Sequence, residues 1–233
     1  MSSRQEEKER RKAERLEAEH QQAIAARRAR LLQTVGGSVL VAAVVAIAFI
    51  LVTSQAGSGG AGTPASSSGP HAPIPAPKIT DLAAAAKAAG CVAKTFPDYG
   101  RNHVDGTLNY KTNPPTSGNH NPVPAQDGIY APANTPAKEH LVHALEHGRI
   151  EIQYRPGTTG HVIAQLNTLF DEPVKGQAGY KTLLFQNPTR MPYAIAATAW
   201  TQLLACPTMN PQVFDALRAF RTTYVDKGPE FIP

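Results

Sequence analysis

The feature that most constrains this chain is an uncharged apolar segment near its N-terminus. It runs from Leu31 to Val52, with the sequence LLQTVGGSVLVAAVVAIAFILV, and its 22 residues include no charge. An α-helix rises about 1.5 Å per residue, so a helix of this length can cross the roughly 30 Å hydrocarbon core of a bilayer. The segment therefore predicts a single transmembrane helix over residues 31–52.

The residues on either side of this segment predict its orientation. Three arginines lie between residues 27 and 30, whereas residues 53–77 carry no Lys, Arg, Asp or Glu. Positive residues are enriched on the cytoplasmic side of a membrane. We therefore expect a charged, helical cytoplasmic tail over residues 1–30, with the rest of the chain extracytoplasmic at the cell membrane. The alternative is a signal peptide cleaved near Ala56, although the charged region before the apolar run is long for such a peptide.

The composition changes after the apolar segment. Residues 53–77 contain five Gly, five Pro and five Ser, which is typical of a flexible, partly extended linker. We assign residues 53–78 to this linker and residues 79–233 to one extracytoplasmic domain. That domain is nearly neutral, with thirteen Lys/Arg and twelve Asp/Glu. A nucleic-acid-binding domain carries its basic patch on the folded surface, so we expect no nucleic-acid partner.

The domain reads as a mixture of helices and strands. Helices are expected over residues 81–89, 137–147, 162–170 and 210–224, and strands over residues 103–110, 150–154, 180–186 and 193–201. A loop rich in proline and glycine is expected over residues 111–136, with Thr135 as the N-cap of the helix that follows and Gly148 just beyond its end. Because the elements do not alternate with a regular βαβ period, the fold class expected is α+β.

Cys91 and Cys206 are the two cysteines of the chain. Neither belongs to a C-x-x-C pair, which excludes a thioredoxin-like site and a zinc ribbon. In an oxidising compartment outside the membrane we expect them to form a disulfide, which would contribute about 4 kcal/mol in the chain-entropy model. The alternatives are two buried free thiols, or one thiol that serves as a soft metal ligand.

The strongest chemical signal is a group of histidines in the helix expected over residues 137–147. His143 and His147 are four residues apart and therefore share a helix face, with Glu139 and His140 near that face. Two imidazoles one turn apart are a common way to hold copper or zinc. The alternative is an ordinary packing helix whose histidines interact with its C-terminus.

Further ligands must come from other segments. His120 is the first candidate, because Pro114 and Pro115 stiffen the loop before it and Gly118 permits a sharp turn. His103 is the second candidate. Methionines, Met191 and Met209, would complete a softer site of the Cu(I) type.

The segment from His143 to His147 also matches H-x-x-E-H, the inverted zinc-peptidase pattern, in which Glu146 would be the general base. Such an enzyme needs a distant glutamate ligand, for which Glu172 and Glu230 are candidates. The sequence contains no G-x-S-x-G, Walker or G-x-G-x-x-G motif. An enzymatic activity is therefore the weakest of the hypotheses.

Several motifs together resemble the bacterial domain-of-unknown-function family 3105. The motifs, in chain order, are PPTSGNH (114–120), GIY (128–130), VHALEHG (142–148) and IQY (152–154), followed by the pair Ala199 and Trp200. The resemblance covers most of residues 90–225 and implies a single-pass or secreted envelope protein. It implies no activity, because that family has none established.

Three hypotheses follow from the sequence. The first is a membrane-anchored module that binds copper or zinc through His143 and His147, with His120 and His103 as further ligands. The second is a structural or interaction module of the cell envelope that binds a protein partner and no metal. The third is a zinc hydrolase of the H-x-x-E-H type.

Overall fold

The structure is a computed structural model that describes residues 69–230 and residue 232. The predicted tail, the predicted membrane helix and most of the predicted linker lie outside these residues. In the part that is described, no helix combines the length and the hydropathy that a bilayer span requires. The described chain forms a mixed α+β domain around a six-stranded sheet, so the expected fold class is confirmed.

The elements are few and short. The helices are α2 (Leu82–Ala89), α3 (Lys138–Glu146), α4 (Gly160–Asp171) and α5 (Val213–Tyr224), with a 3₁₀ helix η2 (Pro132–Asn134). The strands are β1 (Val92–Thr95), β2 (Gly128–Ile129), β3 (Ile150–Tyr154), β4 (Thr182–Gln186), β5 (Ile195–Ala199) and β6 (Gln202–Cys206).

The strands form one sheet in the order β1-β6-β5-β3-β4-β2. β4 pairs in parallel with both β2 and β3, and the remaining pairs are antiparallel. β5 and β6 form a hairpin in which Ala199 lies opposite Gln202, so Trp200 and Thr201 make the turn. Thr201 adopts a φ of 63° there, and this turn brings Trp200 to one end of the sheet.

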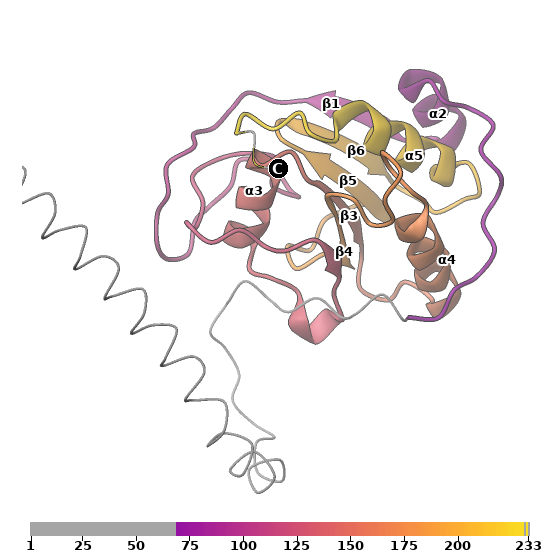
Figure 1. Cartoon of the computed structure of the whole chain (residues 1–233), viewed down its shortest axis with the longest axis horizontal. Helices are drawn as coiled ribbons and strands as arrows, with labels where there is room; N and C mark the ends of the chain where they lie inside the picture. Colours follow the sequence, from indigo (N-terminus) through magenta and orange to yellow (C-terminus); the bar gives the residue numbers. More distant parts are fainter. Residues whose placement is uncertain (1–68, 231, 233) are drawn as a thin grey trace, which may run out of the picture. The chain divides into compact units, whose positions relative to one another are not determined.

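The helices cover the two faces of the sheet unequally. α2, α4 and α5 lie on one face and α3 lies on the other (Figure 1). Successive side chains of a strand point to opposite faces, so Ile150 and Ile152 of β3 join the apolar core under α2, α4 and α5. Glu151 and Gln153 of the same strand point to the α3 face. Because both faces are covered, β3 is buried along its whole length.

A buried polar network lies on the α3 face of the sheet. Gln153 Nε2 donates hydrogen bonds to Glu151 Oε2 at 2.9 Å and to Thr198 Oγ1 at 3.0 Å. Thr198 Oγ1 donates to the same carboxylate oxygen at 2.8 Å. Asn187 Nδ2 donates to Gln153 Oε1 at 2.7 Å. Burial raises the pKa of Glu151 to about 8, so this carboxyl group is protonated at neutral pH.

The helix predicted over residues 81–89 is confirmed, including both of its ends. The Asp81 side chain accepts a hydrogen bond from Ala84 N, and Gly90 ends α2 in the left-handed conformation. Directly after it, Cys91 forms the predicted disulfide with Cys206, with an S–S distance of 2.06 Å. The disulfide joins the N-terminal end of the described domain to the end of β6.

The last part of the predicted linker packs against the domain. Ala72 N donates to Ala164 O of α4 at 3.2 Å, and Thr168 Oγ1 donates back to Ala72 O at 2.8 Å. Ile74 packs against the apolar core. Ordered packing therefore begins before residue 79, because the prolines of this segment run extended along α4 with their carbonyl groups paired to its polar side chains.

Two expectations for individual elements were wrong, and three strands were missed. Residues 103–110 do not form a strand, because their pairing is limited to one bridge between His103 and His120. Strands β1, β2 and β6 were not predicted, and β2 lies within the segment expected to be a loop. The N-cap of α3 is Ala137 rather than Thr135, because η2 intervenes and Thr135 ends that 3₁₀ helix instead.

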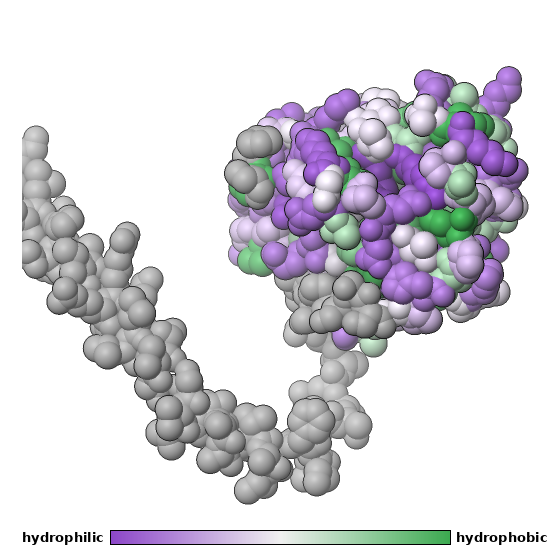
Figure 2. All heavy atoms as spheres, turned by 45° about the vertical axis from the view of Figure 1, so that its right-hand side comes forward, coloured by the Kyte–Doolittle hydropathy of each residue, from purple (hydrophilic) through white to green (hydrophobic). Residues whose placement is uncertain are grey.

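The outer surface is largely polar. On the face shown in Figure 2, hydrophilic residues cover most of the area and hydrophobic residues form small separate areas. The large hydrophobic side chains that the described chain exposes are Val92, Tyr99, Val123 and Ile232. The side chains with metal-binding chemistry lie elsewhere, mostly buried beside α3.

Candidate metal centre

α3 and the residue that caps its C-terminus, His147, present three polar side chains toward one region. His143, Glu146 and His147 are separated by three and four residues, a spacing that places them on one helix face, and each is less than 7 % exposed. The opposite side of α3 packs Leu141 and Ala144 against strand β4. Packing on that side fixes the direction in which the three polar groups point.

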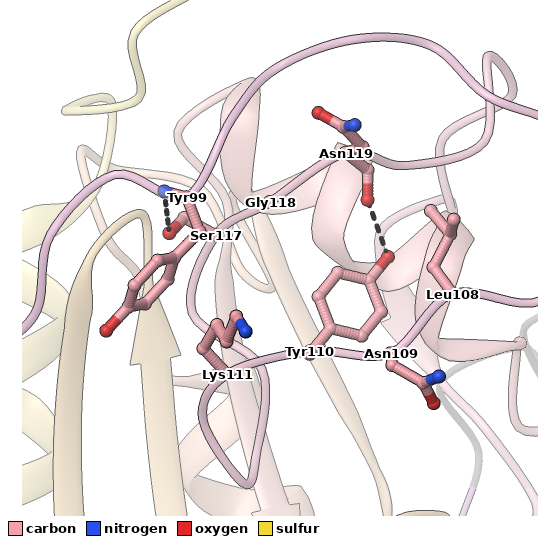
Figure 3. A pocket seen from close by; sticks show the side chains of 8 residues that line it. All are labelled: Tyr99, Leu108, Asn109, Tyr110, Lys111, Ser117, Gly118 and Asn119. Carbon is pink, nitrogen blue, oxygen red and sulfur yellow. Dashed lines mark hydrogen bonds between the residues drawn. The ribbon is translucent and has the colours of Figure 1, made fainter.

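The loop before α3 presents His120. Gly118 has a φ of 134°, and a Cβ atom there would lie 3.1 Å from the Tyr110 ring. Tyr110 donates its hydroxyl hydrogen to Asn119 O at 2.9 Å, and Ser117 Oγ accepts from Tyr99 N at 3.2 Å. These contacts line a cavity of about 180 Å³ (Figure 3). They brace the loop on its outer side, so His120 is held in a fixed position.

Backbone pairing with the His120 segment places His103 beside the same region. Val104 N donates to His120 O at 2.8 Å, and His120 N donates to Asn102 O at 3.1 Å. This pairing places the two imidazole rings side by side, with their centres 5.1 Å apart. His103 is the outermost histidine of the group, and its side chain is 48 % exposed.

Four donors converge in what we call the inner set: His103, His120, His143 and Glu146. One ligand atom from each lies within 4.8 Å of the others. His120 Nε2 is 2.9 Å from Glu146 Oε2, and His103 Nε2 is 3.9 Å from the same oxygen. Two ligands of one ion at about 2.0–2.1 Å per bond are about 2.9 Å apart at a right angle and about 3.4 Å apart at a tetrahedral angle. The shorter contact therefore has the length expected of two ligands of one ion.

The three rings of the inner set form a nearly equilateral triangle. The ring centre of His143 is 4.7 Å from that of His103 and 4.7 Å from that of His120. An imidazole centre lies about 3 Å from an ion that its nitrogen binds, which places the centres of three such rings about 4.5–5 Å apart. The observed triangle matches this arrangement.

A second group, the outer set, consists of His143, His147 and Glu230. His143 Nε2 and His147 Nε2 are 2.9 Å apart, and His147 Nε2 is 3.3 Å from Glu230 Oε2. Glu230 comes from residues 226–230, which we call the C-terminal strap. After α5 the chain returns to the end of α3 (Figure 1), where Asp226 N donates to Gly148 O and Glu230 N donates to Glu146 O.

Backbone carbonyl groups determine which ring nitrogens are free. His143 Nδ1 is 2.7 Å from Asn121 O, and His120 Nδ1 is 2.9 Å from Gly118 O. A carbonyl oxygen only accepts, so each Nδ1 carries the hydrogen and each neutral ring has a lone pair on Nε2. Metal-binding histidines are commonly oriented by such a contact on the second nitrogen.

His120 Nε2 is the least satisfied of these nitrogens. The His120 side chain is fully buried, and its Nε2 has no hydrogen-bond partner among the described residues. Glu146 Oε2 is near enough at 2.9 Å, yet it lies off the direction of a hydrogen bond. A buried nitrogen with an unused lone pair is costly, and a bound cation would satisfy it.

Burial also disfavours the charged forms of the groups on α3 and at its end. It lowers the pKa of His143 to about 4, against the opposing effect of the hydrogen bond to Asn121. Burial lowers the pKa of His147, assisted by the nearby Arg149. Burial raises the pKa of Glu146, against the opposing effect of His120. Neutral imidazoles are the form that binds a metal, so His143 is ready to bind at neutral pH.

The structure brings together the four histidines singled out from the sequence. It excludes other candidates: Met191 and Met209 pack in two separate apolar clusters, and Glu172 pairs with Arg218. His140 points away from the group, with Nδ1 2.6 Å from Val123 O.

Two carboxylates lie with the histidines, and the sequence gave them different roles. Glu146 was interpreted only as a catalytic base, whereas Glu230 was one of two candidates for the distant glutamate ligand of the hydrolase hypothesis. Of those two candidates the structure places Glu230 beside His143 and His147, whereas Glu172 pairs with Arg218. Because Glu230 lies 83 positions from His147, no local signal distinguished it from Glu172.

The donor set favours particular ions. It consists of imidazole nitrogens and carboxylate oxygens without sulfur. Such ligands suit zinc and copper(II), whereas Cu(I) prefers thiolate and thioether sulfur. With both methionines elsewhere, the arrangement offers no support for a Cu(I) site.

Comparison with known proteins gives one match. Residues 103–231 match the model of a family described as "Protein of unknown function (DUF3105)". This range includes every donor of the inner and outer sets. No curated protein matches the chain, and no solved structure matches it.

Proposed function

The chain belongs to the DUF3105 family of proteins of unknown function, and we propose that its domain binds one divalent transition metal, zinc or copper(II), at the inner set. The role is binding rather than turnover: sequestration, delivery or sensing of the ion. The Glu146 carboxylate offsets part of its charge, and the buried rings of His120 and His143 shield it from water.

The observation that carries this proposal is the convergence of His120 and His143. Each ring is held by a carbonyl group on Nδ1, and each directs an unprotonated Nε2 to one region beside Glu146. In a purely structural cluster, buried lone pairs face hydrogen donors. Here His120 Nε2 has no donor among the described residues and lies 2.9 Å from the Glu146 carboxyl group, and the partner of His143 Nε2 is the neighbouring imidazole of His147. Such an arrangement suits a cation site.

The direct test is the metal content of the purified full chain in detergent. After dialysis against zinc or copper(II), we expect about one ion per chain, and a His120→Gln/His143→Gln variant should retain none. Glutamine keeps a polar side chain of similar size, and circular dichroism would verify that the variant is folded. A His161→Gln variant, which changes an exposed histidine of α4, is the matched control. Equal, negligible metal in all three proteins would favour the alternative, an envelope interaction module without metal.

Glu146 separates binding from hydrolysis. Its carboxylate lies among the donors, 2.9 Å from His120 Nε2, which is the place of a ligand. We therefore expect Glu146→Gln to weaken zinc binding about tenfold or more. As the general base of an H-x-x-E-H hydrolase, Glu146 would instead be dispensable for zinc and required for peptide cleavage. A variant that keeps zinc and loses cleavage of a peptide library would establish the hydrolase.

We further propose that residues 31–52 anchor the domain in the cell membrane, with residues 1–30 cytoplasmic, residues 53–78 as a connection and the domain extracytoplasmic. The apolar segment, the arginines before it and the Cys91–Cys206 disulfide support this topology, because disulfides persist in oxidising compartments. Protease added outside intact cells should degrade the domain and spare an epitope at residue 1. Protection of the domain would reverse the topology.

A further inference from the structure

The inner and outer sets share His143, so the two sets cannot both bind an ion through this residue at the same time. His143 Nδ1 is engaged by Asn121 O at 2.7 Å, so the ring has one nitrogen to offer. One lone pair binds one ion at a time. An ion held by His143 in one set must therefore leave the other set.

The two sets differ in how they meet solvent. In the inner set, His120, His143 and Glu146 are all buried. His103 is half-exposed, and backbone hydrogen bonds of the residues before and after it, Asn102 and Val104, hold its segment against His120. In the outer set, the Glu230 side chain is 49 % exposed. A carboxylate at the surface attracts a hydrated cation, whereas a neutral imidazole does not.

Glu230 is also held differently from the other donors. It lies on the C-terminal strap, where close backbone packing positions it: a Cβ atom on Gly228 would lie 2.1 Å from Glu146 O. Salt bridges from Lys181 and Lys175 to Asp226 fix the start of the strap. The backbone of the strap is thus anchored over the end of α3, while the Glu230 side chain extends into solvent.

From these contacts we infer that the outer set is the loading position of the centre. A divalent cation binds first to Glu230 and His147, is then taken by His143, and passes to His120 and Glu146. This inference rests on the proposed function. At each step one ligand replaces another on the ion, and no oxidation or reduction is involved. The 2.9 Å between the two Nε2 atoms makes the transfer short.

A group that contacts the ion only during transfer has a distinct kinetic signature. It lowers the barrier equally in both directions, so its loss slows loading and release by the same factor and leaves the equilibrium affinity unchanged. A ligand of the resting ion instead changes the affinity. Glu230 is expected to behave in the first way and Glu146 in the second.

The test uses the full chain in detergent with Zn²⁺ alone as the probe. Stopped-flow mixing with a chromogenic chelator gives the release rate, mixing with Zn²⁺ gives the loading rate, and competition gives the Kd. We expect Glu230→Gln to slow both rates about tenfold with little change in Kd, and Glu146→Gln to raise the Kd about tenfold or more. Asp171→Asn, which removes a carboxylate from α4 on the other face of the sheet, should match the parent.

The outcomes separate the two proposals. Parent rates in Glu230→Gln would overturn the loading role and leave the metal site intact. A Kd raised as much as in Glu146→Gln would make Glu230 a ligand of the resting ion and would also overturn it. Absence of zinc binding by the parent chain would overturn the proposed function itself.

Discussion

The two faces of the sheet bury side chains of different kinds. Under α2, α4 and α5 most buried groups are apolar, from Ala85 of α2 to Phe220 of α5. The polar exceptions on α4 and α5 are Asn167, Asp215 and Arg221. On the α3 face, the buried groups include the histidines, Glu146 and the network around Glu151. One strand, β3, contributes to both faces through alternate residues.

This difference indicates a division of roles. Apolar burial stabilises a fold by about 25 cal/mol per Å², whereas burial of polar and ionisable groups costs free energy unless they are paired. The apolar face therefore supplies most of the stabilising free energy. Part of that free energy offsets the cost of burying the reactive groups on the α3 face. Substitutions on the two faces should accordingly affect different measurements.

The largest expected effect is on the apolar face. Phe220 of α5 is completely buried, so Phe220→Ala should lower the free energy of unfolding by about 3–5 kcal/mol through lost contacts and the cavity left behind. Denaturant unfolding of the metal-free chain measures this. Phe220→Leu is the milder control. The zinc Kd of the folded fraction should not change, and a changed Kd would break the division between the faces.

The disulfide on the same face should come next. Cys91 and Cys206 both belong to the apolar core, and their removal as a Cys91→Ala/Cys206→Ala pair should cost about 2–4 kcal/mol. Reduction of the parent chain should give a similar loss in the same unfolding experiment. An unchanged free energy of unfolding would mean that apolar packing alone holds Cys91 and Cys206 together.

On the α3 face, stability should depend on the ion. Zinc at one hundred times its Kd should stabilise the parent chain by about 2.7 kcal/mol, because it binds the folded form. His143→Gln should remove this gain, and the His161→Gln control should keep it. Thermal unfolding with and without zinc gives the comparison. A gain that survives in His143→Gln would place the ion elsewhere.

The smallest effect, taken over a single pH unit, should appear as a slope of stability with pH. The folded-state pKa of Glu151 is about 8, above its ordinary value of 4.5. Between these values the folded chain retains a proton that the unfolded chain has lost. The contribution of Glu151 is therefore full below pH 4.5 and falls by up to about 1.4 kcal/mol per pH unit as the pH rises toward 8.

Glu151→Gln tests this directly, since an amide does not titrate. The variant should match the parent near pH 4 and become progressively the more stable of the two toward pH 8. Urea unfolding at several pH values measures the difference. Parallel pH profiles for the two proteins would show that the carboxyl group is charged in the folded state.

The sequence predicted elements whose ends carry local signals. α2 was foreseen from its run of alanines, and the structure shows that Asp81 and Gly90 cap it. The β5–β6 hairpin was missed because its turn places Thr201 at a positive φ without the glycine or asparagine that usually marks such a turn. The short strand β1 was missed because all four of its residues are exposed, so it shows no alternation.

The same distinction holds for the candidate centre. The spacing of His143 and His147 on one helix was sufficient to pair them, and the stiff loop before His120 pointed to a third donor. Two contacts arise from tertiary packing. They are the hydrogen bond from His143 Nδ1 to Asn121 O and the contact of Glu230 with His147. No local pattern specifies how a loop and a chain end meet a helix.

The C-terminal strap also has a consequence for biosynthesis. The donors extend from His103 to Glu230, so Glu230 is the last of them to be synthesised. If an ion loads through Glu230 as proposed, it joins a domain whose other donors have already been made. Such an ion would be drawn from the compartment in which the folded domain resides, and the supply of metal there would decide whether the protein is filled.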